Sequence, residues 1–96
     1  MPELSWTPAA LADLRRINDW LNREASPEIA LRTLTAIKVR NGQLAEFPLS
    51  GRAIPNHGFR VLPILGTRHL LAYRFDGGAV DIIRVYQERQ NWRDSA

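Results

Sequence analysis

The chain has 96 residues, of which 45% are hydrophobic and 24% are charged, and it carries a formal net charge of +3. This length and balance predict a single folded domain over residues 1–96 and exclude an intrinsically disordered chain. With no cysteine, no apolar run of about 20 residues and no signal-peptide pattern, we expect a cytoplasmic protein without disulfides, thiolate metal sites or a membrane span.

A short strand and a helix are the first expected elements. Residues 4–6 alternate apolar and polar side chains, which is typical of an edge strand. Thr7 can cap a helix, and Pro8 suits a first helical turn. Apolar residues then recur at helical spacing as far as Leu21. We expect the intervening positions, Asp13 among them, to face solvent.

A second helix is expected to begin with Ser26 as its cap and Pro27 in its first turn. Gly42 interrupts its apolar stripe at a cost of about 1 kcal/mol relative to alanine. We expect one helix that bends at Gly42, with a helix–turn–helix break as the alternative. The short link at residues 24–25 makes the two helices an antiparallel hairpin. Three aromatic residues are expected in the core where the first strand meets the helices: Trp6, Trp20 and Phe47.

Beyond the helices the apolar period changes from 3.6 to 2. Residues 48–58 hold two prolines and two glycines and are expected to lack regular structure. Residues 60–65 resemble a strand, which Pro63 confines to an edge or a bulge. The clearest strands, residues 69–75 and 79–86, are joined by an Asp-Gly-Gly turn typical of a hairpin. The expected order is β-α-α-β-β-β, an α+β fold.

A two-residue turn at Gly77 and Gly78 would set the register of this hairpin, and a three-residue loop would move it. Three pairs would then lie beneath the helices: Arg74–Asp81, Ala72–Ile83 and Leu70–Val85. The first of these would be an ion pair near the turn. The opposite face would gather His69, Tyr73, Arg84 and Tyr86, with His69 directly across from Tyr86.

The positive charge is concentrated in the middle of the chain. Residues 1–46 hold six basic and six acidic side chains, and residues 76–96 hold three basic and four acidic ones. Residues 47–75 hold four arginines and no acid: Arg52, Arg60, Arg68 and Arg74. Such a segment suits an acidic partner, either a phosphate backbone or an acidic peptide. The alternative is that these arginines only solvate strands.

Several motifs, taken together and in order, carry a family resemblance. They are Trp6-Thr7-Pro8-Ala9-Ala10, Asp13-Leu14 with Ile17, Ser26-Pro27, Phe47-Pro48, Gly51-Arg52, Tyr73-Arg74, Ile82-Ile83-Arg84-Val85 and Arg89-Gln90-Asn91-Trp92. Over nearly its whole length the chain resembles the ParE/RelE toxins of type II toxin–antitoxin systems, and its ending resembles the ParE branch. The resemblance implies a mainly antiparallel sheet of about four strands with a two-helix hairpin packed on one face. It also implies a cognate antitoxin whose C-terminal segment, commonly acidic or amphipathic, wraps the toxin.

The resemblance leaves two activities open. ParE members poison DNA gyrase, whereas RelE members cut mRNA on the ribosome with basic residues and, in several branches, a His or Tyr near the chain end. Cleavage through the 2′-hydroxyl needs a base, an acid and cations. The cations could come from Arg52, Arg60, Arg74 and Arg84. His69 with Tyr86 is the one acid/base pair available, because Gln87 stands where relatives often carry a histidine.

The incomplete proton-transfer set favours a toxin that binds DNA gyrase and uses no cofactor or metal. Its expected partner-binding residues are Arg52, Arg60, Arg74, Arg84, Tyr86 and Trp92. One alternative is a ribosome-dependent mRNA endoribonuclease with Arg60 and Arg84 on the phosphate and His69 or Tyr86 moving protons. The other is a binding module that has lost toxicity. In each case the antitoxin is expected to cover the basic sheet segment.

Overall fold

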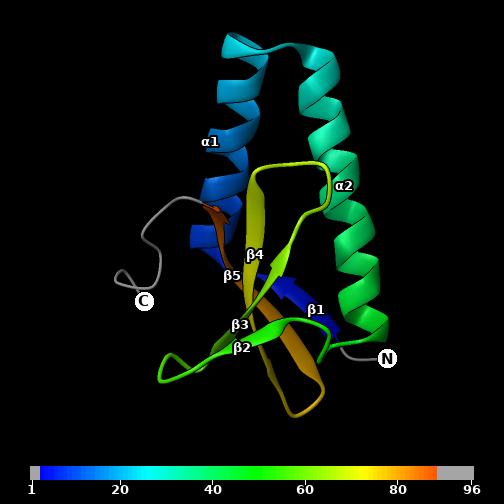
Figure 1. Ribbon diagram of the computed structural model, residues 1–96, viewed down its shortest axis with the longest axis vertical. Helices are drawn as coiled ribbons and strands as arrows, with labels where there is room; N and C mark the ends of the chain where they lie inside the picture. The colour runs from blue at the N-terminus through cyan, green and yellow to red at the C-terminus, as the bar shows by residue number, and fades with distance from the viewer. Residues whose placement is uncertain (1–2, 89–96) are drawn as a thin grey trace.

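A computed structural model describes residues 3–88, which fold into a layer of two helices against a five-stranded sheet (Figure 1). In chain order the elements are β1 (Glu3–Trp6), α1 (Pro8–Glu24), α2 (Pro27–Glu46), β2 (Arg52–Ile54), β3 (Phe59–Pro63), β4 (His69–Asp76) and β5 (Ala79–Gln87). The helices run antiparallel and cover one face of the sheet (Figure 1). The expected α+β fold is confirmed.

Both helices begin as their capping residues predict. The Thr7 hydroxyl accepts a hydrogen bond from the Ala10 N–H at 3.1 Å, and the Ser26 hydroxyl accepts one from the Ile29 N–H at 3.1 Å. α2 continues through Gly42 without interruption, so the helix–turn–helix alternative is wrong. Within residues 3–88, neither helix combines the length and apolarity that crossing a membrane requires.

The sheet has the strand order β1-β5-β4-β3-β2, with β1 parallel to β5 and every other pair antiparallel. β1 is an edge strand, as expected. β2 is an addition, because residues 48–58 were expected to be irregular. Its three residues pair with β3 only as far as Val61. Such a short strand forms because β3 supplies its hydrogen-bond partners, and three residues are too few to show a strand pattern in the sequence. Pro63 lies beyond that pairing, where its missing N–H leaves no bond unmade.

The β4–β5 hairpin keeps the expected register only near its turn. Gly77 and Gly78 form the two-residue turn with φ values of 59° and 93°, a region that favours glycine. Arg74 faces Asp81 as expected. A bulge then shifts the register between Ala72 and Tyr73. The pairs that follow are Ala72–Arg84, Leu71–Val85, Leu70–Tyr86 and His69–Gln87, so the expected Ala72–Ile83, Leu70–Val85 and His69–Tyr86 pairs are wrong.

The two faces of the sheet carry separate apolar clusters. The face beneath the helices presents Leu71, Tyr73, Val80, Ile82 and Val85 to Ala10, Ile37 and Leu44 of the helices. The face away from the helices carries a second cluster of Ile54, Phe59, Val61, Leu70, Ala72 and Tyr86. The expectation that Leu70, Ala72 and Arg74 lie beneath the helices is therefore wrong. Apolar residues occupy both faces, so alternation alone could not assign them.

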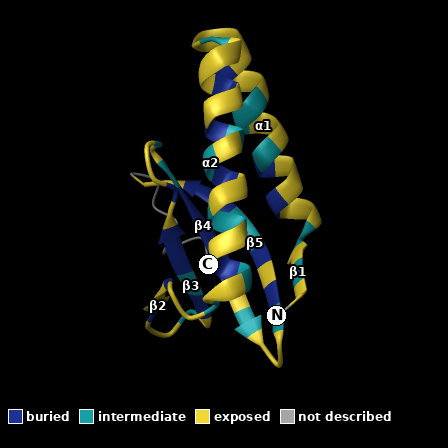
Figure 2. Ribbon diagram, turned by 90° about the vertical axis from the view of Figure 1, so that its right-hand side faces the viewer, coloured by how far each residue is buried: buried dark blue, intermediate teal, exposed yellow. Residues whose placement is uncertain are grey.

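Two of the three aromatic residues expected in the core are exposed. Trp20 is 54% exposed and Phe47 is 63% exposed, whereas Trp6 is half-buried against the helix-side core. The linked ends of α1 and α2 project past the sheet (Figure 1), and Trp20 lies in the last turns of α1. Figure 2 shows mostly buried central strands and largely exposed outer helix surfaces.

Candidate partner-binding site

A buried acid lies where the pairing of β1 with β5 ends. Asp13 is 1% exposed, so the expectation that it faces solvent is wrong. β1 pairs with β5 only as far as Ile82, and the start of α1 covers the next part of the β5 edge. The Thr7 hydroxyl donates to the Ile83 carbonyl at 3.0 Å, and the Asp13 carboxylate accepts the Val85 N–H at 2.9 Å. The side chain thus replaces the backbone acceptor that a longer β1 would supply.

The same carboxylate binds two arginines. Arg84 donates from Nε to Oδ2 at 2.7 Å and from Nη2 to Oδ1 at 3.1 Å, and Arg16 donates to Oδ1 from Nη2. Burial raises the pKa of Asp13, but hydrogen bonds from Arg84 and Val85 outweigh it and bring the pKa below its ordinary 3.8. The hydrogen bond to Asp13 raises the pKa of Arg84. Arg84 also lies over the Tyr86 ring, 5.3 Å from its centroid, so its guanidinium is fixed on two sides.

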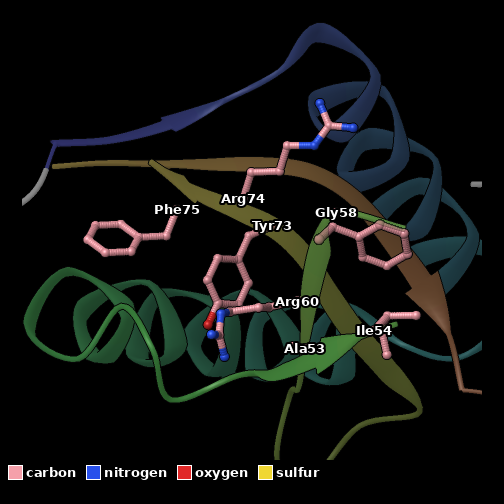
Figure 3. Close-up of a pocket in the computed structure, with 8 residues that line it drawn as sticks. Ala53, Ile54, Gly58, Arg60, Tyr73, Arg74 and Phe75 are labelled. Atoms are coloured by element: carbon pink, nitrogen blue, oxygen red, sulfur yellow. The ribbon is translucent and has the colours of Figure 1, made fainter. Parts of the chain in front are cut away.

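Arg60, one of the expected partner-binding residues, lies on the helix side of the sheet with Tyr73, its partner across β3 and β4. Its Nη1 donates to the Gly51 carbonyl at 2.7 Å. The Tyr73 hydroxyl donates to the Pro48 carbonyl at 2.8 Å and accepts the Gly51 N–H at 2.8 Å. Burial raises the pKa of Tyr73, which keeps the phenol neutral. Figure 3 shows Arg60 beside Tyr73 and Arg74 projecting the other way, so Arg60 helps to hold the loop between α2 and β2.

The other expected arginines lie on or beside the face away from the helices. Arg52 pairs with Val61, a member of the cluster on that face, and its side chain is exposed. Val61 pairs in turn with Ala72, and Ala72 pairs with Arg84. These residues form one row across the sheet, with Arg52 at one end and Arg84 at the other. Arg74 is exposed in the neighbouring row. The structure thus brings three of the four arginines to one side of the sheet.

The expected ion pair between Arg74 and Asp81 is not among the ion pairs of residues 3–88. Asp81 instead accepts a hydrogen bond from the Ser5 hydroxyl on the neighbouring strand β1. The Arg74 guanidinium therefore makes no ion pair with the acid across the hairpin.

His69 and Tyr86, the expected acid/base pair, lie on opposite faces of the sheet. Tyr86 pairs with Leu70 in the cluster away from the helices, and His69 pairs with Gln87. His69 is half-buried, and its buried Nδ1 has no hydrogen-bond partner. Burial lowers the pKa of His69 below its ordinary 6.5, although the Glu88 carboxylate opposes the shift. The geometry does not couple these two groups for proton transfer.

A groove of about 860 Å³ separates the linked ends of the helices from the ends of β4 and β5. Its helix wall includes Arg16, Ile17, Trp20 and Ile29, and its sheet wall includes Arg68, His69 and Glu88. Exposed apolar side chains with arginines at the rim suit a macromolecular partner. Within the described part of the chain, no three His, Cys, Asp or Glu side chains come together as metal ligands. Trp92, expected to bind a partner, lies outside the described residues.

The burial of Asp13 and the groove were not predicted from the sequence. Asp13 occupies a polar position of α1 by helical periodicity, and its burial results from β1 ending before β5 does. The one sequence signal for its importance was its place in the Asp13-Leu14 motif, which follows the Thr7 cap and precedes the strand that carries Arg84. The groove forms because the helices extend past the end of the sheet, and no local sequence pattern predicts that extension.

Comparison with known proteins places this arrangement in a family. Residues 4–92 match the family model described as the ParE toxin of the type II toxin–antitoxin system parDE. The chain is 33% identical over 85 residues to Toxin RelE2 of Caulobacter vibrioides, covering 88% of this chain and 93% of that protein. It is 29% identical over 89 residues to the putative toxin Y4kP of Sinorhizobium fredii, covering 93% and 91% of the two chains.

Solved structures agree with these matches. A chain of the chromosomal ParDE toxin–antitoxin system of P. aeruginosa superposes with a TM-score of 0.78 and 28% identity, covering 91% of this chain and 96% of that one. A conserved hypothetical protein of Helicobacter pylori shares the fold at 12% identity and a TM-score of 0.59, covering 94% and 98% of the two chains. With its two-helix hairpin, mainly antiparallel sheet and motif order, the chain belongs to the ParE toxin family of type II toxin–antitoxin systems.

Proposed function

We propose that this toxin acts by inhibiting DNA gyrase and that its cognate antitoxin neutralises it. The observation that carries the proposal is the match of residues 4–92 to the ParE family model, since the ParE branch is the one that poisons gyrase. A toxin with this target acts in the cytoplasm, where gyrase and its DNA substrate are found.

The placement of titratable groups supports binding over catalysis. A general acid and a general base must each lie within hydrogen-bond reach of the proton that they move, at about 2.6–3.2 Å or through one water. His69 and Tyr86 lie on opposite faces, and the Tyr86 ring is 4% exposed beneath Arg84. Asp13 already accepts two of the Arg84 N–H groups. These contacts suit a rigid binding surface.

The arginines on the face away from the helices are the proposed contacts for a partner. Arg52 and Arg74 are exposed there, and Arg84 with Tyr86 lies along the β5 side. An acidic antitoxin segment or the gyrase–DNA complex would complement this charge. Arg60 contributes by holding the loop that leads into β2, so its effect on a partner would be indirect.

The test is a supercoiling assay with purified gyrase, relaxed plasmid and ATP. We expect the folded toxin to block supercoiling or to trap cleaved DNA, and we expect prior mixing with the antitoxin to restore activity. Arg15→Gln removes one exposed charge from α1 outside the sheet face and serves as a control that should still inhibit. Full supercoiling in the presence of saturating folded toxin would rule out gyrase as the target.

Ribosome-dependent mRNA cleavage is the second candidate, favoured by the 33% identity to a protein named Toxin RelE2. A cell-free translation reaction separates the two. Cut transcripts that appear only when ribosomes are present would support this candidate, and intact transcripts at the same toxin concentration would remove it.

A further inference from the structure

We propose that Arg16 and Arg84, held together by the buried Asp13, form a preorganised receptor for one carboxylate side chain of the antitoxin. The inference deepens the proposed function, because it rests on the toxin–antitoxin assignment and names one chemical contact within it. The receptor lies on the β5 side of the molecule, where Arg16 also forms part of the wall of the groove.

In this cluster the negatively charged carboxylate is buried, and the two positively charged guanidinium groups are exposed to solvent. Asp13 is 1% exposed, whereas the side chains of Arg84 and Arg16 are 37% and 68% exposed. Oδ1 of Asp13 accepts from both arginines, and Oδ2 accepts from Arg84 and the Val85 N–H. Each carboxylate oxygen thus has two donors and is fully used. Two guanidinium groups around one carboxylate leave a net charge of +1 facing outward.

Both arginines keep donors for a ligand. A guanidinium has about five N–H groups. Arg84 commits its Nε and one Nη2 hydrogen to Asp13, and Arg16 commits one Nη2 hydrogen. The Nη1 groups of these two arginines make no hydrogen bond within residues 3–88. The Asp13 carboxylate and the Tyr86 ring already hold the Arg84 plane, so binding an anion loses little side-chain entropy there.

The surroundings favour a protein carboxylate over a phosphate backbone. Next to Arg16 the groove wall is apolar and aromatic, with Ile17 and Trp20, a combination of arginine and aromatic residues that is typical of protein interfaces. A nucleic-acid track would need a run of cations without acids, but the same groove carries Glu88. A planar carboxylate also matches the paired N–H groups of a guanidinium.

The test measures the dissociation constant of the toxin–antitoxin complex for Arg16→Gln and Arg84→Gln, with Arg15→Gln as the matched control. Arg15 is exposed on the same helix and carries the same charge, but it does not contact Asp13. We expect each of the first two variants to weaken binding by about 10- to 100-fold, the range for a charge-assisted hydrogen bond. The control should change binding by less than about twofold, as expected for a surface charge.

Arg84→Gln leaves Asp13 with one ion-pair partner and is expected to lower stability, so Arg16→Gln is the decisive variant. Arg16 is mostly exposed and donates one hydrogen bond to the cluster. The melting temperature of the Arg16→Gln variant should therefore stay close to that of the wild type. Weaker antitoxin binding at unchanged melting temperature supports the receptor. A scan of antitoxin Asp and Glu residues to Asn and Gln should then find one position whose loss is not additive with Arg16→Gln.

Unchanged antitoxin affinity in both folded variants would overturn the inference and leave the cluster with a structural role alone. Loss of binding to a labelled oligonucleotide, with antitoxin affinity unchanged, would overturn it in favour of phosphate. If the wild-type chain fails to bind its cognate antitoxin, the toxin–antitoxin assignment itself fails, which is a different result from failure of the receptor.

Discussion

Replacing Asp13 by alanine should be among the most damaging single changes in the chain, although helical periodicity places this residue on a surface. The carboxylate is the acceptor for the Val85 N–H at 2.9 Å and for two N–H groups of Arg84. Asp13→Ala therefore leaves a buried backbone donor unpaired at the β5 edge and removes the counter-charge of Arg84.

These losses set the expected magnitude. An unpaired buried N–H costs about 1–3 kcal/mol. Removing one partner of a fully buried ion pair costs about 3–5 kcal/mol, but Arg84 is 37% exposed, so water recovers much of that part. We expect Asp13→Ala to lower the free energy of unfolding by about 2–4 kcal/mol, or the melting temperature by about 10–25 °C for a domain of this size. Asp13→Asn keeps an oxygen for Val85 and should lose about half as much.

Urea denaturation followed by circular dichroism measures these differences, with Asp19→Asn on the exposed side of α1 as the control. The pKa of Asp13 is lower in the folded state than its ordinary 3.8. Its contribution is therefore complete above pH 3.8 and is lost as the pH falls through the folded-state value. The wild type and Asp13→Asn should converge in stability at low pH. A loss under about 0.5 kcal/mol for Asp13→Ala, the range of ordinary surface substitutions, would refute this reasoning.

Four further outcomes follow from other parts of the structure. Tyr73→Phe removes both hydrogen bonds of the hydroxyl and should lower the free energy of unfolding by about 2–4 kcal/mol in urea denaturation. Gly51→Ala should also destabilise the loop, because its Cβ would lie 2.5 Å from the Tyr73 ring. The pKa of His69 in the folded state lies below its ordinary 6.5. As the pH falls below 6.5, His69 is therefore protonated in the unfolded chain before the folded one, and the stability of the wild type should fall more steeply than that of His69→Gln. Parallel curves of stability against pH would contradict this. Reversing Arg52 and Arg74 to Glu should weaken antitoxin binding in calorimetry by about 1–3 kcal/mol without changing the melting temperature.

Local chemistry was sufficient to predict the parts of the fold that depend on neighbouring residues. The two capping hydroxyls, Thr7 and Ser26, mark the helix starts that the structure shows. Gly77 and Gly78 specify a turn that few other residues can adopt, which set the first pairs of the β4–β5 hairpin. Resemblance supplied the rest of the architecture, a helical hairpin on one face of a mainly antiparallel sheet.

The register beyond Tyr73 could not be predicted, because it depends on a bulge that alternation does not reveal. Leu70, Leu71 and Ala72 are three consecutive apolar residues, so a shift by one position still buries a hydrophobic side chain on either face. The candidate site shared this error. Arg84 was identified as a site residue, but its partner Asp13 was not, since the contact requires β1 to end two residues short of Arg84's place on β5.

The most direct test of gyrase inhibition is expression of the toxin without its antitoxin, with plasmid topology and transcript integrity read from the same cells. We expect plasmids that lose negative supercoiling or appear linear while messenger RNA remains full length at the onset of growth arrest. Cleaved transcripts in cells whose plasmids stay normally supercoiled would contradict gyrase inhibition.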